Sequence, residues 1–229
     1  MELSEDIDIP EIIPVMTLRD TVLFPHAVMP LFIFEQRYRE MIADILKSHR
    51  LFAIFNEDTD SETEGQEEPP AKMGTVGVVR AAHQNPDGTS NLALQGIIRV
   101  RLLEVVQESP YRLVRIETCP CEESDEDNDS YSINRNQILS HLEKQPELTR
   151  GLPEEYVQFL QSLEQTGPFI DVAIHSICHD PAIKQRLLET LSLGHRYEIF
   201  EQFLIKEEAR LDLFDKLQGS TRDDEIELN

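Results

Sequence analysis

The chain has 229 residues, of which 40% are hydrophobic and 28% are charged, a composition typical of a globular protein with a buried core. Its 44 acidic residues outnumber its 21 lysines and arginines and give a formal net charge of -23, which argues against nucleic acid or an anionic membrane as partner. Its 3 cysteines are too few for a disulfide scaffold, so we expect a protein of a reducing compartment.

Residues 9–121 predict a β-rich domain with one helix. Apolar side chains at three- and four-residue spacing in segment 35–48 predict an amphipathic helix. The sequence Asn85–Gly88, with proline second and glycine fourth, predicts a tight turn between two strands. Short antiparallel strands that close on themselves fit a small barrel or pseudobarrel. The expected strands are 12–18, 27–34, 50–56, 74–84, 89–96, 98–107 and 111–118.

Much of the acidity lies in segments that we expect to be loops or ends of the chain. Segment 56–70 is rich in carboxylates and ends in Pro69-Pro70, which predicts an acidic mobile loop. Segment 122–129 predicts an acidic linker, and 219–229 an acidic tail.

Residues 130–218 predict a helical domain. Asp180 followed by Pro181 indicates the N-cap and first residue of a helix. The expected helices are 133–145, 153–165, 169–179, 180–193 and a long helix at 195–218. The fold class is therefore α+β: a β pseudobarrel with one helix, an acidic linker, and a helical domain that ends in a long helix.

No segment predicts a membrane span or a secretory signal. The apolar stretch Thr21–Phe34 has only 14 residues, against about 20 needed to cross a bilayer, and two prolines interrupt it. The N-terminus has neither the basic nor the apolar region of a signal peptide. We expect a cytoplasmic protein without a membrane partner.

The candidate metal-ligating residues do not match a known ligand pattern. His175, Cys178 and His179 lie on one predicted helix, but the glutamate of a zincin helix is replaced by Ser176. Cys119 and Cys121 are closer together than the cysteines of zinc knuckles. Phosphate-loop and nucleophile-elbow motifs are also missing from the sequence, so we predict no metal, no cofactor and no enzymatic activity.

The stretch around Met29 is apolar on both faces of the predicted strand. Met29, Leu31 and Ile33 alternate with Pro30, Phe32 and Phe34. One face can line the barrel interior, and the other requires a second cover. The helix 35–48, the helical domain or an external partner can each supply it. Cover from within the chain is favoured, because large exposed apolar patches are rare on proteins without a partner.

The order of three motifs resembles the N-terminal domain of Lon proteases. The first is "IPVMTLRDTVLFPHAVMPLFIFEQRYREMI", the second comprises "MGTVGVVR" and "NPDGTSNLALQGIIRVRL", and the third is "FIDVAIHSICHDPAIKQRLLETLSLGHRYEIFEQFLIKEE". Together they extend over roughly residues 9–217. The sequence departs from the family pattern at His26, where the family carries glycine after Phe-Pro.

The resemblance implies a PUA-like pseudobarrel followed by a helical bundle, and a domain that engages the substrates of Lon. Because these 229 residues contain no ATPase or Ser-Lys peptidase motif, we expect the domain to stand alone. The predicted function is a non-catalytic polypeptide-binding or adaptor module in protein quality control. Its expected partners are unfolded or partly folded polypeptides, or a protease or chaperone. The alternative is a small-ligand-binding protein or hydrolase with a cleft between the β and helical domains.

The expected polypeptide contacts come from the apolar loop and strand that open the domain. Proline restricts this loop, and its large apolar side chains suit exposed apolar segments of a client. The candidate residues are Phe24, Pro25, His26, Val28, Met29, Phe32 and Phe34.

Overall fold

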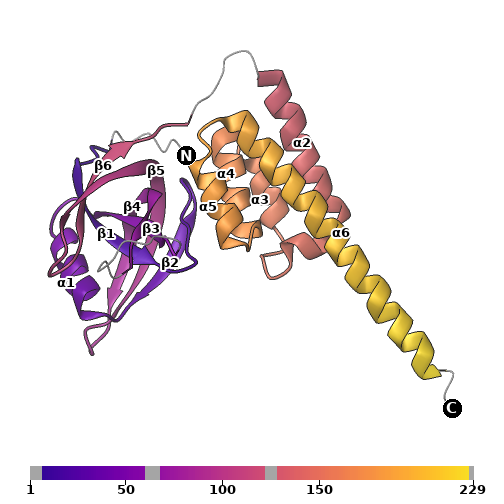
Figure 1. Cartoon of the computed structure of the whole chain (residues 1–229), viewed down its shortest axis with the longest axis horizontal. Coiled ribbons are helices and arrows are strands. Elements are labelled where there is room, and N and C mark those ends of the chain that lie inside the picture. Colours follow the sequence, from indigo (N-terminus) through magenta and orange to yellow (C-terminus); the bar gives the residue numbers. More distant parts are fainter. Residues whose placement is uncertain (1–6, 60–67, 122–127, 227–229) are drawn as a thin grey trace. The chain divides into compact units, whose positions relative to one another are not determined.

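The computed structural model describes residues 7–59, 68–121 and 128–226 and divides the chain into two compact units (Figure 1). The first unit contains Met1–Cys121 together with Asp180–Leu191, and the second contains Glu122–His179 and Ser192–Asn229. The predicted mobile loop falls largely on residues 60–67, and most of the predicted linker falls on residues 122–127. Both of these ranges lie outside the described residues.

The first unit is built on a six-stranded sheet in the order β2-β5-β4-β3-β1-β6. An additional pairing of β5 with β6 closes β1, β3, β4, β5 and β6 into a ring, and leaves β2 attached to β5 outside it. The strands are β1 Ile12–Leu18, β2 Val28–Ile33, β3 Leu51–Glu57, β4 Pro70–Gln84, β5 Ser90–Gln107 and β6 Leu113–Thr118.

Two features of the sheet differ from the sequence prediction. The pairing of β1 with β3 is parallel, not antiparallel, because the intervening chain with β2 and one helix brings β3 back in the same direction. The two strands expected at 89–96 and 98–107 form the single strand β5. Gly96 does not end this strand, since β4 pairs with β5 on both sides of it through a register shift.

The interior of the ring is a cluster of aliphatic and aromatic side chains that alternate with outward-facing residues along each strand. Helix α1 (Gln36–Ile45) adds the buried side chains of Tyr38, Met41, Ile42 and Ile45, the face that its sequence spacing predicts. The predicted turn also forms: Gly88 has a φ of 83° and its N–H donates to Asn85 O at 2.9 Å. The ring cluster contains Ile13, Val15, Leu51, Ala53, Phe55, Val76, Val78, Val100, Val114 and Ile116.

Helix α5 (Pro181–Glu189) belongs to the first unit, although the sequence analysis placed it in the helical domain. Asp180 caps it as predicted, accepting hydrogen bonds from Ala182 N at 2.9 Å and Ile183 N at 3.0 Å. At its other end the buried Arg99 of β5 donates from Nε to Leu188 O at 3.0 Å. A cation that binds a last-turn carbonyl satisfies a group that the helix leaves open and matches the helix dipole.

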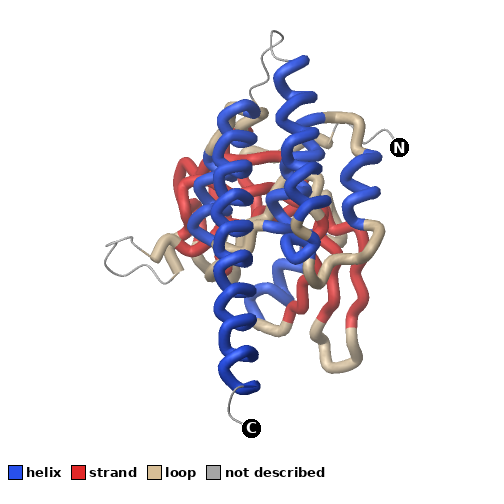
Figure 2. Tube along the Cα trace, turned by 90° about the vertical axis from the view of Figure 1, so that its right-hand side faces the viewer, coloured by secondary structure: helices blue, strands red, loops and turns tan. Residues whose placement is uncertain are grey.

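The second unit consists of helices packed around their apolar faces, with α2 and α6 side by side (Figure 2). Its core includes Ile138, Leu160, Phe169 and Phe200. A buried ion pair joins Arg196 Nη1 to Asp171 Oδ1 at 3.0 Å. The helices are α2 Asn128–Lys144, the 3-10 turn η2 Pro146–Thr149, α3 Tyr156–Ser162, α4 Thr166–Ile177 and α6 Leu193–Ile226.

Two of these helices extend further than the sequence suggested. Helix α2 begins at Asn128, inside the segment expected to be a linker. Helix α6 continues to Ile226, through most of the expected acidic tail, and residues 227–229 lie outside the described part of the chain. Because these segments are acidic, we expected them to be a linker and a tail. They nevertheless contain few helix-breaking residues, and their described residues form helix.

Two arginines of β5 provide a matched test of this fold. Arg99→Ala is expected to lower the free energy of unfolding by about 2–4 kcal/mol, because it leaves a cavity and a buried carbonyl without its donor. Arg101→Ala should change it by less than about 1 kcal/mol, because Arg101 is half exposed and its ion pair with Glu117 is solvated. Urea denaturation measures both variants, and equal losses would contradict the assigned role of Arg99.

Candidate functional site

The turn Phe24–Ala27 lies directly against Gly96 of β5. His26 N donates to Gly96 O at 2.9 Å, and Gly96 N donates to Ala27 O at 2.9 Å. A Cβ added at Gly96 would approach Phe24 O to 2.1 Å, which no side chain can do. Glycine is therefore required at this position for the turn to reach the strand.

The first two candidate residues, Phe24 and Pro25, are buried beneath the surface of the site. Phe24 has a relative exposure of 0%, and the guanidinium carbon of Arg99 lies 5.6 Å from the centre of its ring. Pro25 is also buried. Neither side chain faces solvent, so their function in this structure is to position the strand that follows.

His26 is half-buried and adopts a φ of 65°. This left-handed conformation is the one that glycine adopts most readily. The glycine of the family pattern therefore suits the backbone conformation of this position. In this chain a histidine adopts the same conformation, although its Cβ makes that conformation less favourable.

The remaining apolar candidates divide between the two faces of β2. Met29 and Leu31 point to the inner face and are half-buried, whereas Ile33 on the same face is buried. Val28, Phe32 and Phe34 are exposed to 55%, 56% and 62%. We call the four exposed apolar residues Val28, Pro30, Phe32 and Phe34 the β2 strip.

The two aromatic side chains of the β2 strip are in mutual contact. The ring centroids of Phe32 and Phe34 are 6.1 Å apart, with an interplanar angle of 27°. Phe32 pairs across the sheet with Asn91, and Pro30 pairs with Ala93. Neither neighbour is large enough to cover an aromatic ring, and the second face of β2 is open in this structure.

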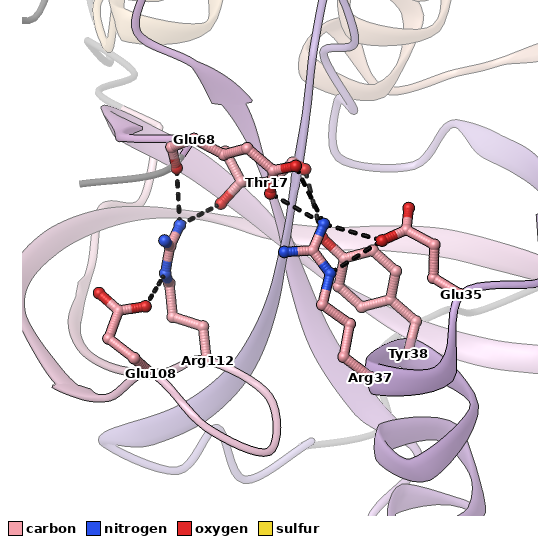
Figure 3. Close-up of polar contacts among 7 residues, drawn as sticks. All are labelled: Thr17, Glu35, Arg37, Tyr38, Glu68, Glu108 and Arg112. Carbon is pink, nitrogen blue, oxygen red and sulfur yellow. Dashed lines mark hydrogen bonds and ion pairs between the residues drawn. The ribbon is translucent and has the colours of Figure 1, made fainter. Parts of the chain in front are cut away.

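Charged side chains around the start of α1 form a network of ion pairs and hydrogen bonds with one another (Figure 3). Arg37 forms ion pairs with Glu35 and Glu68, each at 2.9 Å. The hydrogen bond to Glu68 raises the pKa of Arg37, and burial raises the pKa of Tyr38 to about 12.

Arg112 completes this network on the other side of Glu68. Its Nη1 donates to Glu68 O at 2.7 Å and to Thr17 Oγ1 at 2.8 Å, while Nε binds Glu108. The two arginines thus fix the end of the acidic segment to β1 and α1. This network is structural, because its cations are occupied by carboxylates and carbonyls of the same unit.

A small cavity of about 280 Å³ lies between α1 and the β4–β5 hairpin. Its size falls just below the range of roughly 300–1,000 Å³ common for small-ligand pockets. Arg39 reaches from its wall to Asp87 O at 3.3 Å, and Gln36 donates to Glu40 at 2.6 Å. Its lining includes Gln36, Arg39, Glu40, Ala82, Gly88 and Ser90.

The described residues contain neither a cluster of metal ligands nor a helix that could span a membrane. Among them, His175 is half-buried, Cys178 is buried and His179 is exposed, and they form no group of three or more suitable ligands. Within the same residues, no helix is long and apolar enough to cross a membrane.

Comparison with known proteins agrees with the three sequence motifs. The family model of the ATP-dependent protease La (LON) substrate-binding domain matches residues 12–206. The chain therefore belongs to the Lon substrate-binding domain family, and the predicted resemblance is confirmed.

The similar curated proteins are much longer than this chain. It is 26% identical over 223 residues to the Lon protease of Dictyoglomus thermophilum, covering 97% of this chain and 28% of that protein. It is 28% identical over 221 residues to the Lon protease of Anaeromyxobacter dehalogenans, covering 94% of this chain and 25% of that protein. The chain thus spans about a quarter of the length of these relatives.

Two solved structures share the fold. The N-terminal domain of a Mycobacterium avium complex Lon protease matches with a TM-score of 0.65 and 17% identity, covering 84% of this chain and 97% of that one. A Lon N-terminal domain protein from Xanthomonas campestris matches with a TM-score of 0.52 and 18% identity, covering 85% and 97%. The α+β fold class predicted from the sequence is confirmed.

The roles of Gly96 and Arg99 in positioning the turn Phe24–Ala27 were not predicted from the sequence. Gly96 stands at the end of the strand expected at 89–96, and the alternation of the next strand places Arg99 and Arg101 on one face without distinguishing between them. The available signal was the glycine itself, because a glycine inside a strand often marks a place where another part of the backbone approaches closely. Arg99 follows Gly96 by only three positions.

Substitutions at His26 test the backbone conformation of the turn. His26→Gly should keep or raise the free energy of unfolding, by up to about 1 kcal/mol, because glycine adopts positive φ without steric strain. His26→Val should lower it by about 1–2 kcal/mol. His83→Val is the control, since exposed His83 lies in extended β4. Thermal and urea unfolding measure all three variants, and a His26→Gly protein less stable than His26→Val would contradict this explanation.

Proposed function

We propose that this protein is a non-catalytic module that binds exposed apolar segments of polypeptides through the β2 strip. The observation that carries the proposal is the exposure of three large apolar side chains: Val28 and Phe32 on β2, and Phe34 directly after it. Burying one such side chain contributes about 1.5–3 kcal/mol, so several together can supply useful affinity.

The β2 strip is suited to an apolar partner because β2 contains no charged residue. A partner that covers it would desolvate no ionised group of the strand, which would otherwise oppose binding. The arginine nearest in sequence, Arg37, is already held by Glu35 and Glu68. Folded proteins bury most of their apolar segments, so this surface would favour unfolded or partly folded chains over native ones.

The β2 strip is also held in place before a partner arrives. The turn that precedes it is fixed to Gly96 by two hydrogen bonds of 2.9 Å, and its Phe24 is fully buried. A surface that is already ordered loses little conformational entropy on binding. Family membership supports a substrate-binding role, and we extend it to polypeptide clients in protein quality control.

The test compares an unfolded chain with its native form. A reduced, alkylated polypeptide that cannot refold should bind in fluorescence anisotropy, and its native counterpart should not. The double variant Phe32→Ser/Phe34→Ser should weaken binding by more than about tenfold, because two aromatic side chains lose their burial.

Phe159→Ser provides a matched control. Phe159 is an aromatic residue exposed to 49% in the helical unit, so its loss should leave the affinity within about twofold. Equal binding of native and unfolded chains, or an unchanged affinity of the double variant, would overturn the proposal.

A further inference from the structure

We propose that the polypeptide segment binds by adding a strand to the free edge of β2. This inference rests on the proposed function and concerns how the same surface holds its partner. It assigns part of the recognition to main-chain hydrogen bonds, and therefore requires an extended partner segment.

The position of β2 in the sheet leaves one of its edges open. Among the residues that the structure describes, β2 pairs with β5 alone and stands at the end of the strand order. The backbone hydrogen bonds found outside helices and ladders in the described part of the chain do not involve Val28, Pro30 or Phe32. An edge strand without a neighbour presents a row of donors and acceptors.

Pro30 shows which main-chain groups face this edge. Antiparallel pairs alternate between hydrogen-bonded and non-hydrogen-bonded positions, and proline has no N–H to donate. Pro30 pairs with Ala93, so this position must be of the non-hydrogen-bonded kind. The ladder bonds to β5 therefore come from Met29, Leu31 and Ile33. The main-chain groups of Val28, Pro30 and Phe32 point to the open edge.

The inner face of β2 is also incomplete at this edge. Met29 and Leu31 point to the same side as buried Ile33, yet both are only half-buried. An added strand would place its own side chains beside them and beside Val28 and Phe32 on the outer face. Main-chain pairing would thus extend burial on both faces of β2, whereas docking on the outer face alone would leave Met29 and Leu31 half-buried.

The occupant that fits this edge better is a foreign segment and not a second copy of β2. Pro30 removes one donor from the edge. When two β2 strands pair with each other, each contributes a proline, and two donors are missing. A client segment without proline loses only the donor of Pro30. Proline at an edge is a common means of opposing self-association.

Hydrogen exchange by NMR on the wild-type protein tests the pairing. The probe is a synthetic peptide that alternates apolar and neutral polar residues. In the free protein, the amides of Met29, Leu31 and Ile33 should exchange slowly and those of Val28 and Phe32 quickly. At saturating peptide, exchange at Val28 and Phe32 should slow by about tenfold or more, because their N–H groups enter a ladder.

A pair of substitutions at one position separates the main chain from the side chain. Val28→Pro removes an edge donor, and Val28→Ala shortens the side chain but keeps the donor. Val28→Pro should bind the peptide about three- to tenfold more weakly than Val28→Ala, the value of one hydrogen bond. Slow exchange at Met29 and Leu31 in both variants verifies that the ladder to β5 remains.

The outcomes separate this inference from the proposed function. If no apolar peptide binds, the proposed function fails. If peptides bind and depend on Phe32 and Phe34, but exchange at Val28 and Phe32 stays fast and the two Val28 variants bind equally, strand addition is wrong while the proposed function stands. A free protein that dimerises through β2 and is not dissociated by peptide would also overturn strand addition, because the edge would then hold a second copy.

Discussion

The close contact between the turn Phe24–Ala27 and Gly96 sets the course of the chain through the candidate site. Two hydrogen bonds of 2.9 Å hold the turn on β5, and a side chain at Gly96 would collide with Phe24 O. Because the turn is fixed there, the next residues leave it as a strand along β5. That strand lies outside the closed ring, so one face and one edge of it stay open.

The buried arginine of β5 connects this contact to the rest of the first unit. Arg99 lies over the ring of Phe24 and binds the last turn of α5 through Leu188 O. Gly96 and Arg99 thus act on the same turn: Gly96 allows its backbone to approach β5 closely, and Arg99 contacts the aromatic ring of Phe24. This arrangement keeps apolar side chains exposed on a rigid base and not on a loop that could fold away.

The distribution of charge has a similar consequence. The chain carries a net charge of -23, yet β2 carries no charge, and Glu35, which follows β2 closely in sequence, forms an ion pair with Arg37. A polypeptide that approaches the β2 strip would meet an uncharged surface, although the protein as a whole is strongly acidic. The acidic segments favour solubility, which offsets the tendency of an exposed apolar strand to associate.

The sequence was sufficient to predict elements that have a single apolar face, and turns or caps whose residue types have a known structural role. It predicted β1 as Ile12–Leu18, the turn at Asn85–Gly88 and the cap at Asp180. It could not reveal the parallel pairing of β1 with β3, which depends on the path of the chain between them. The sequence also showed that both faces of β2 are apolar, but not which one remains uncovered, since cover depends on residues far along the chain. Arg99 illustrates the same limit, because α5, which lies about 80–90 residues further on in sequence, decides its burial.

The most direct test of the central claim is an NMR titration of the isotopically labelled protein with a reduced, permanently unfolded polypeptide. The account predicts that the largest changes in amide chemical shift fall on Val28–Phe34 and on the paired residues of β5. Changes centred on the helical unit, or on the cavity lined by Arg39 and Gly88 with β2 unaffected, would contradict it.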